Sequence, residues 1–272
     1  MQTDDYTEKN RAAWNQAAPV HRQQRKGNLF EEVQHPSFNT LGAVEQRVLA
    51  EIGILGKKVA QFCCNNGREL ISMLKMGAAY GMGFDISDAF IDEARQLTDL
   101  AGVRCDFLRT DVLQIAAEYD ASFDLVFISI GALTWLADLE KLFEVCRRLL
   151  QPGGYLFIYE MHPFLDMMAT TDDPEYDPQD ELKIAFPYFN TEPWVSTDGL
   201  DYYGGTTYDS VESIGFPHTL SEILTAILGS GLILTEYREY PHDISEVFKY
   251  LEKYQKIPMC YSLVARRGGS GN

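Results

Sequence analysis

The sequence lacks the features that would place the chain in a membrane or in an oxidising compartment. No run approaches the ~18 consecutive apolar residues of a membrane-spanning helix. The opening stretch, MQTDDYTEKNRAAW, has no apolar signal-peptide centre. The five cysteines are odd in number and contain no Cys-x-x-Cys pair, which argues against a disulfide framework or a zinc site. We therefore expect a cytoplasmic protein with no metal centre and no membrane partner.

Basic charge is also scarce, since 23 Lys and Arg face 40 Asp and Glu and give a formal net charge of −17. Affinity for nucleic acid depends on neutralising phosphates, so a DNA or RNA partner is disfavoured. The best basic stretch, HRQQRK at residues 21–26, is short, and we expect it to be a solvated face.

What is present is an alternation of short apolar runs and amphipathic stretches from Lys58 onward. The runs KVAQFCC, YGMGFDI, VRCDFLRTD, FDLVFISI and YLFIYE predict five strands, and LILTEYREY and MCYSLVARR predict two more. Between them, RELISMLKMG, DAFIDEARQLTDLAG, ADLEKLFEVCRRLLQPGG and HTLSEILTAILGSG predict helices, with Ser87 and Thr219 as caps. This order indicates an α/β fold with a mostly parallel sheet and right-handed crossovers.

The same pattern divides the chain. We expect a helical lid at 1–50, a core formed by 51–162 and 213–267, an inserted cap of antiparallel strands and loops at 163–212, and a tag remnant or disordered tail at 268–272. On a helix, Tyr6, Asn10 and Trp14 share a face. That face either covers a pocket or simply packs on the body.

The first predicted strand runs into CCNNG and then into a helix. Parallel sheets bind ligands beyond the carboxyl ends of their strands, where the strand order reverses. Gly67 allows a close backbone approach there, and Asn65 tolerates a positive φ. Asp85 ends the second strand 18 residues after Gly67, close to the ~20 typical of nucleoside-binding folds, and can accept hydrogen bonds from both ribose hydroxyls.

Two ligand classes fit this geometry. A dinucleotide needs Gly-x-Gly-x-x-Gly against its pyrophosphate, and Cys63 and Asn65 stand at the earlier glycine positions, which disfavours NAD. S-adenosylmethionine carries ribose and adenine without phosphate, so its loop needs fewer glycines. Asp111, which ends the third strand, can accept the adenine amino group, cap the predicted helix VLQIAAEY, or do both.

The series VAQFCCNNGREL, YGMGFDIS, RTDV, FDLVFISIGALTWL and RRLLQPGGYLFIYE resembles the class I S-adenosylmethionine-dependent methyltransferases over about residues 58–160. The resemblance implies a Rossmann-like, seven-stranded sheet with helices on both faces, and S-adenosylmethionine as cofactor. It also implies the cofactor-binding residues, namely Cys63, Cys64, Asn65 and Gly67 in the loop, Asp85 and Ile86 at the ribose, Asp111 and Val112 at the adenine, and Ser129 and Ile130 at the methionine end. The chain departs from the family at Gln61, where relatives have an acid, and at two of three loop glycines.

Such a fold predicts methyl transfer to an oxygen or nitrogen of a small molecule. His162 and His218 are the candidate general bases, although each also has a structural explanation beside Pro163 or the cap Thr219. Aromatic side chains suit a planar, apolar or cationic acceptor. They are Trp14, Trp135, Tyr159, Tyr202 and Tyr203.

Two alternatives stay open: a non-catalytic or regulatory S-adenosylmethionine-binding protein, and, disfavoured by the loop, a nicotinamide oxidoreductase. The acceptor, the methylated atom and the oligomeric state stay open as well.

Overall fold

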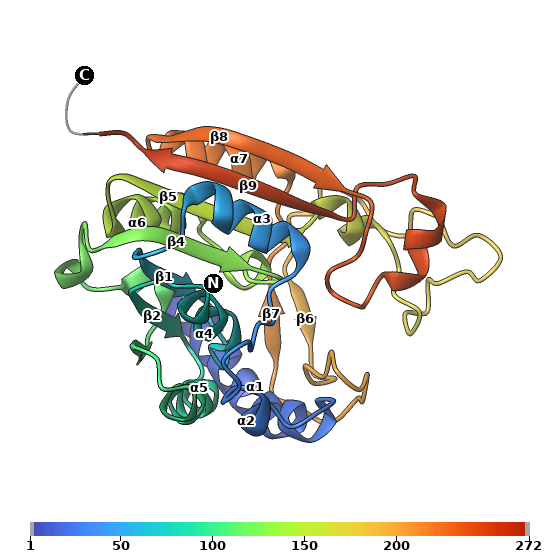
Figure 1. The fold of residues 1–272 in the computed structure, drawn as a ribbon. Coiled ribbons are helices and arrows are strands. Elements are labelled where there is room, and N and C mark those ends of the chain that lie inside the picture. Colours follow the sequence, from blue (N-terminus) through green and yellow to red (C-terminus); the bar gives the residue numbers. More distant parts are fainter. Residues whose placement is uncertain (1–2, 270–272) are drawn as a thin grey trace.

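The computed structural model describes residues 3–269, and its main feature is a seven-stranded sheet in the order β3-β2-β1-β4-β5-β9-β8. The strands are Lys58–Phe62 (β1), Tyr80–Asp85 (β2), Cys105–Arg109 (β3), Phe123–Ser129 (β4), Leu150–Met161 (β5), Leu232–Tyr240 (β8) and Cys260–Arg267 (β9). Only β9 pairs antiparallel with its neighbours, β5 and β8 (Figure 1). The predicted mostly parallel sheet is confirmed. The order reverses at β1, which lies between β2 and β4.

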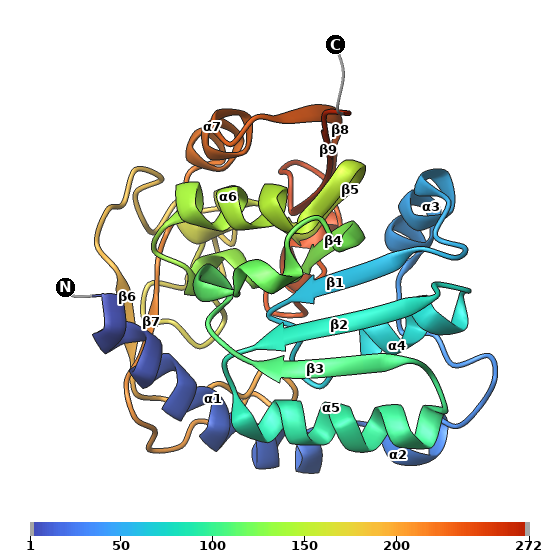
Figure 2. The ribbon, with the colours of Figure 1, turned by 90° about the vertical axis from the view of Figure 1, so that its left-hand side faces the viewer.

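Helices cover both faces of this sheet (Figure 2). They are Ala43–Ile52 (α3), Arg68–Lys75 (α4), Asp88–Ala101 (α5), Leu139–Leu149 (α6) and Leu220–Gly229 (α7). Successive residues of a strand face opposite sides. Accordingly, Phe62 of β1 packs into a core with α6 and α7, whereas Val59 packs into a second core with α3, α4 and α5. The sheet is thus buried on both sides, as its apolar strands require.

The predicted helix caps are confirmed. The Ser87 hydroxyl accepts a hydrogen bond from the Phe90 N–H at 3.3 Å. Thr219 and Glu222 form a reciprocal capping box, in which each side chain accepts the other's backbone N–H.

One predicted helix and one predicted strand boundary are wrong. The VLQIAAEY segment forms two short 3₁₀ turns, Val112–Gln114 and Ala117–Tyr119, and not an α-helix. Strand β5 begins at Leu150, before the Pro-Gly-Gly that was expected to separate helix from strand. Leu150 pairs with Phe123 across a register shift, so the strand runs through the irregularity.

The segment 163–212 is mostly irregular. It contains a 3₁₀ turn, Pro163–Met167, and one short strand, Trp194–Ser196 (β6). Strand β6 pairs antiparallel with Ser213–Gly215 (β7), so residues 213–215, assigned to the core from the sequence, pair with the insertion instead. Figure 1 shows this small sheet running from beneath the main sheet toward the N-terminal helix.

Two further helices precede α3: Thr3–Gln24 (α1) and Leu29–Glu32 (α2). Helix α1 lies against α5 and β7. Asn10 joins α1 to β7, because its side chain donates to the Ile214 carbonyl at 2.8 Å and accepts the Ile214 N–H at 2.7 Å. Of the predicted tail, residues 268–269 lie outside any helix or strand, and 270–272 fall outside the described residues.

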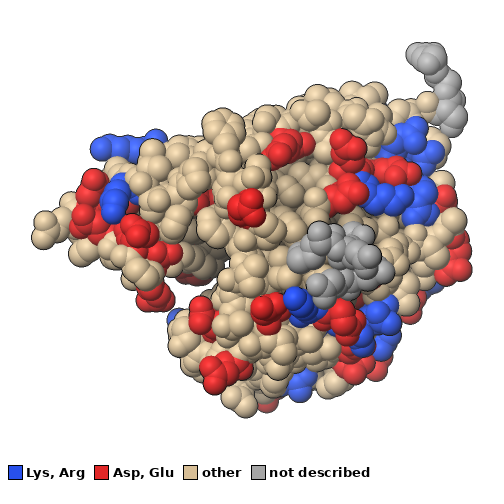
Figure 3. Space-filling view, turned by 180° about the vertical axis from the view of Figure 1, so that it is seen from behind, with Lys and Arg blue, Asp and Glu red and all other residues tan. Residues whose placement is uncertain are grey.

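The basic stretch at residues 21–26 was expected to be a solvated face, and the structure corrects this in part. His21 is buried and the Arg25 side chain pairs with buried Glu93, whereas residues 22–24 and 26 are exposed. On the face shown in Figure 3, acidic and basic side chains are interspersed. Within residues 3–269, none of the helices combines the length and apolar character needed to cross a bilayer.

Candidate functional site

A cavity of about 460 Å³ opens beyond the carboxyl ends of β1 to β4. Helix α1, the insertion at 202–203 and the loop 244–247 close it. Most residues predicted for the site line it: Cys63, Cys64, Asn65, Asp85, Ile86, Asp111, Val112, Ser129, Ile130, Trp14, Trp135, Tyr202 and Tyr203. Gly67, Tyr159, His162 and His218 do not line it.

The loop after β1 has the backbone of a glycine-rich loop with few glycines. Cys63, Asn65 and Gly67 all adopt left-handed conformations, with φ of 49°, 50° and 72°. Glycine and asparagine adopt that region readily, whereas cysteine does not. Gly67 shapes the loop from behind, because a Cβ there would lie 2.5 Å from the Phe107 ring.

Asp85 ties this loop to the second strand. Its carboxylate accepts the Asn65 N–H at 2.7 Å and the Ser87 N–H at 2.8 Å. Burial raises the pKa of Asp85, while the N–H donors of Ser87, Asn65 and Ile86 lower it. A carboxylate has about four acceptor positions, so this fixed group can still accept hydroxyl donors from the cavity.

Asp111 follows β3 and lines the cavity beyond the carboxyl end of that strand. Its carboxylate accepts the Leu113 N–H at 2.9 Å, so it caps the 3₁₀ turn that follows. The capping role expected from the sequence is therefore present, and the same residue also lines the cavity.

Arg68 and Glu69 also line the cavity, and the sequence analysis missed both. The Glu69 carboxylate accepts the Gln61 amide at 2.6 Å and the Ser129 hydroxyl at 2.7 Å. Arg68 donates to the Tyr203 hydroxyl at 2.6 Å. Their position directly after the ligand loop, at the start of a helix, was the available signal.

Glu160, at the end of β5, holds the loop after β4. Its buried carboxylate accepts backbone N–H groups from Gly131, from Ala132 at 2.8 Å, from Leu133 at 3.3 Å and from Met161 at 2.9 Å. The sequence analysis missed this residue too. The signal was the one that identified Asp85, an acid closing a buried strand.

The two histidines predicted as bases lie away from the cavity. His162 caps a 3₁₀ turn through Nδ1, and its Nε2 lies 3.1 Å from a carboxylate oxygen of Glu239. His218 bonds through Nε2 to the Leu136 carbonyl at 2.8 Å. Burial lowers the pKa of both imidazoles. Within the described chain the cavity lining contains no histidine.

Tyr159 and the neighbouring pair Cys63 and Cys64 pack into the cores on the two sides of the sheet. The Tyr159 hydroxyl lies 2.9 Å from His242 Nε2, within the core on the α3 side of the sheet. Cys63 packs against the core on the α6 side and Cys64 lies in the opposite core, as expected for adjacent side chains at the end of a strand. Among residues 3–269, no group of three or more His, Cys, Asp or Glu has the geometry of a metal site.

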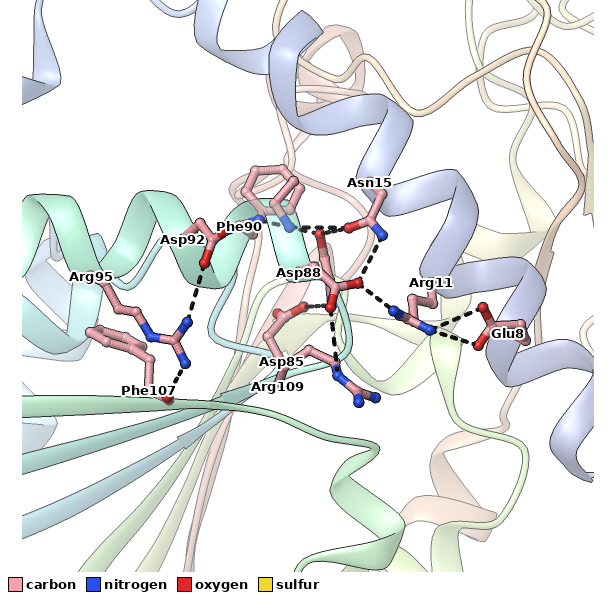
Figure 4. A network of polar contacts seen from close by, with 12 residues as sticks. Glu8, Arg11, Asn15, Asp85, Asp88, Phe90, Asp92, Arg95, Phe107 and Arg109 are labelled. Carbon is pink, nitrogen blue, oxygen red and sulfur yellow. Dashed lines mark hydrogen bonds and ion pairs between the residues drawn. The ribbon is translucent and has the colours of Figure 1, made fainter.

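Helix α1 is bonded directly to the segment that follows Asp85 (Figure 4). Asn15 accepts the Ser87 hydroxyl at 2.8 Å and the Ala89 N–H at 3.1 Å, and it donates to Asp88 at 3.0 Å. Arg11 donates to the same Asp88 carboxylate at 2.8 Å. The helix that closes the cavity is thus fixed to the segment that directly follows the candidate ribose-binding acid, Asp85.

Replacing Asn15 by alanine should lower the free energy of unfolding by about 1–2 kcal/mol, because three hydrogen bonds are lost and the Ser87 hydroxyl is left buried. Urea denaturation measures this. Gln23→Ala, an exposed change on the same helix, is the control. Equal stability of the two variants would show that the three Asn15 hydrogen bonds contribute nothing.

Comparison with known proteins agrees with this arrangement. The family model described as "Methyltransferase domain" matches residues 59–154. A ubiquinone biosynthesis O-methyltransferase of Pseudomonas aeruginosa is 31% identical over 106 residues, which are 39% of this chain and 45% of that protein. The chain thus spans less than half the length of this curated relative.

Solved structures match over more of the chain. An S-adenosylmethionine-dependent methyltransferase from Mesorhizobium loti superposes with a TM-score of 0.57 and 21% identity, over 83% of this chain and 99% of that chain. The [4+2]-cyclase SpnF superposes with a TM-score of 0.55 and 13% identity, over 94% of this chain and 95% of that chain. At these identities the likeness establishes the fold. The chain thus contains a methyltransferase domain at residues 59–154, on a fold that it shares with S-adenosylmethionine-dependent methyltransferases.

Proposed function

We propose that the protein transfers the methyl group of S-adenosylmethionine to an oxygen or nitrogen of a small molecule. The observation that carries the proposal is Asp85, fixed beneath the left-handed Cys63–Gly67 loop at the switch point of the sheet and facing the cavity. The matching relative is an O-methyltransferase by name, which favours oxygen as the methylated atom.

The residues present fit the cofactor. Asp85 would accept the ribose hydroxyls and Asp111 the adenine amino group, while Ser129 and Ile130 would border the methionine end. S-adenosylmethionine, when bound, supplies a methyl group already activated on a sulfonium. The protein's share of the catalysis is then to orient the acceptor in line with that methyl group and to exclude water.

The acceptor side of the cavity is aromatic. Trp14 and Trp135 meet edge to face with ring centroids 5.1 Å apart, and Trp14 also faces Tyr202. These rings come from α1, the loop after β4 and the insertion, so the cavity closes only when all three segments are in place. Such walls favour a planar or apolar acceptor. We propose that the N-terminal segment acts as a lid and the insertion as a cap over this cavity. We also propose that the enzyme is cytoplasmic and acts on a small molecule, not on nucleic acid.

Proton removal from the acceptor would need a base at the cavity. His162 and His218 would have to leave their present partners to reach an acceptor, and Glu246, a carboxylate of the cavity lining, is a nearer candidate. One structural neighbour is named as a cyclase, so this fold also serves other functions. The second candidate function for this chain is therefore cofactor binding without methyl transfer.

The experiment is calorimetric titration of the purified protein with S-adenosylmethionine and with S-adenosylhomocysteine. We expect micromolar dissociation constants, about −8 kcal/mol. NADH, titrated in parallel, should not bind. If neither adenosyl ligand binds, the proposal falls. If both bind and no acceptor in a broad panel of phenols, acids and amines is methylated, the non-catalytic function is favoured.

A further inference from the structure

Glu69 presents an incomplete polar cluster to the cavity. Its Oε2 accepts the Gln61 amide and the Ser129 hydroxyl, which fixes the Gln61 side chain with its nitrogen toward Glu69. The Gln61 Oε1 is then buried, and among the described residues it has no hydrogen-bond partner. A buried acceptor without a donor costs about 1–3 kcal/mol. The Glu69 carboxylate, which lines the cavity, therefore matches a ligand that donates hydrogen bonds and carries positive charge.

Arg68, the preceding residue, presents the opposite charge. It is the only Lys or Arg among the described residues that line the cavity. It donates to the Tyr203 hydroxyl, and its guanidinium lies 5.8 Å from the centroid of that ring. The nearest carboxylate oxygen, on Glu69, is 4.0 Å from its Nε. A phenol cannot neutralise the guanidinium, whose planar fork suits a carboxylate.

The two charges are therefore adjacent and face one cavity. Apart from the 4.0 Å ion pair between them, they are held by neutral partners. We propose that Arg68 and Glu69 bind the two charged groups of an α-amino acid, the carboxylate at Arg68 and the ammonium at Glu69. Gln61 and Ser129 orient Glu69, and Tyr203 of the insertion orients Arg68.

The methionyl end of S-adenosylmethionine is one source of this group, and an amino-acid acceptor is the other. The first source rests on the proposed function. It also gives the departure at Gln61 a reason, because the negative charge absent from β1 is supplied eight residues later, from α4. The Tyr203 contact would make closure of the insertion sensitive to whether the subsite is filled.

Calorimetry with two ligands tests the inference. S-adenosylhomocysteine carries the amino-acid group, and 5′-methylthioadenosine is a similar nucleoside without it. Arg68→Gln and Glu69→Gln should each weaken S-adenosylhomocysteine binding by roughly 10- to 100-fold and leave 5′-methylthioadenosine binding within about threefold. Tyr203→Phe, a milder change, should weaken only the former. Arg238→Gln, at an exposed arginine of β8, is the control.

A variant that exchanges the residues at positions 61 and 69 distinguishes loss of the negative charge from damage to the fold. Gln61→Glu combined with Glu69→Gln moves the carboxylate back to β1 and should recover most of the affinity lost in Glu69→Gln. To identify the source, free amino acids are added to the S-adenosylhomocysteine complex and thermal shifts are recorded. Shifts in the wild type that Arg68→Gln removes, with S-adenosylhomocysteine affinity unchanged, assign the subsite to the acceptor.

Unchanged binding of S-adenosylhomocysteine and of every amino acid in Arg68→Gln and Glu69→Gln would overturn the inference and leave the proposed function intact. If the wild type binds neither nucleoside and no amino acid, both fall.

Discussion

Replacing Glu160 by alanine is expected to lower the free energy of unfolding by about 3–5 kcal/mol. The carboxylate accepts four backbone N–H groups, three of them from the consecutive residues Gly131, Ala132 and Leu133. Its side chain is buried, so water cannot replace it at these donors without entering the core. Denaturant unfolding followed by circular dichroism gives the free energy.

Glu160→Gln distinguishes hydrogen bonding from packing. Each carboxylate oxygen accepts two N–H groups, so the amide nitrogen of glutamine must face two donors in either orientation. We therefore expect Glu160→Gln to lose most of the stability that Glu160→Ala loses, although its shape is almost unchanged. The exposed Glu192→Ala should change stability by less than about 0.5 kcal/mol. A Glu160→Gln variant as stable as the wild type would show that the four contacts contribute little.

Replacing Asp85 by alanine should weaken binding of S-adenosylhomocysteine by about 1–3 kcal/mol, which is roughly 5- to 150-fold. Two effects add. The ribose hydroxyls lose their acceptor, and the Asn65 N–H loses the bond that holds the left-handed loop in place. Calorimetric titration measures the change, provided that the wild type binds this ligand.

Two controls keep this result interpretable. Asp92→Ala removes an exposed carboxylate from nearby α5 and should bind as the wild type does. Asp85→Asn keeps the side chain's size but puts an amide nitrogen against the N–H of Asn65 or Ser87, so it should bind no better than Asp85→Ala. Unchanged affinity in Asp85→Ala would remove this residue from the site and with it the main support for the proposed function.

Local sequence was sufficient for much of the fold. The period of the apolar runs predicted the seven strands, since a fully buried parallel strand must be apolar on both faces. Ser87 and Thr219 marked helix starts because a cap contacts only the next turn. The segment 112–119 was misassigned as a helix, because Ile115 and Ala116 adopt extended conformations that divide it into two 3₁₀ turns.

Part of the candidate site could also be predicted from the sequence. Strand order and strand ends place Asp85, Asp111 and Ser129 at one edge whatever the side-chain details, so these residues were predictable. The loop conformation was predictable from Gly67 and Asn65, and only the structure shows that Cys63 adopts it as well.

The sequence by itself therefore determined the sheet, its helices and the edge at which a nucleoside would bind, because these depend on period, caps and chain order. Tertiary structure alone decided which side chains face the cavity. His162 and His218 follow elements that point toward the site, yet their rings bond to Glu239 and to the Leu136 carbonyl. Arg68 meets Tyr203 across 135 residues of sequence. Contacts of that range depend on how the insertion packs, and no local pattern encodes them.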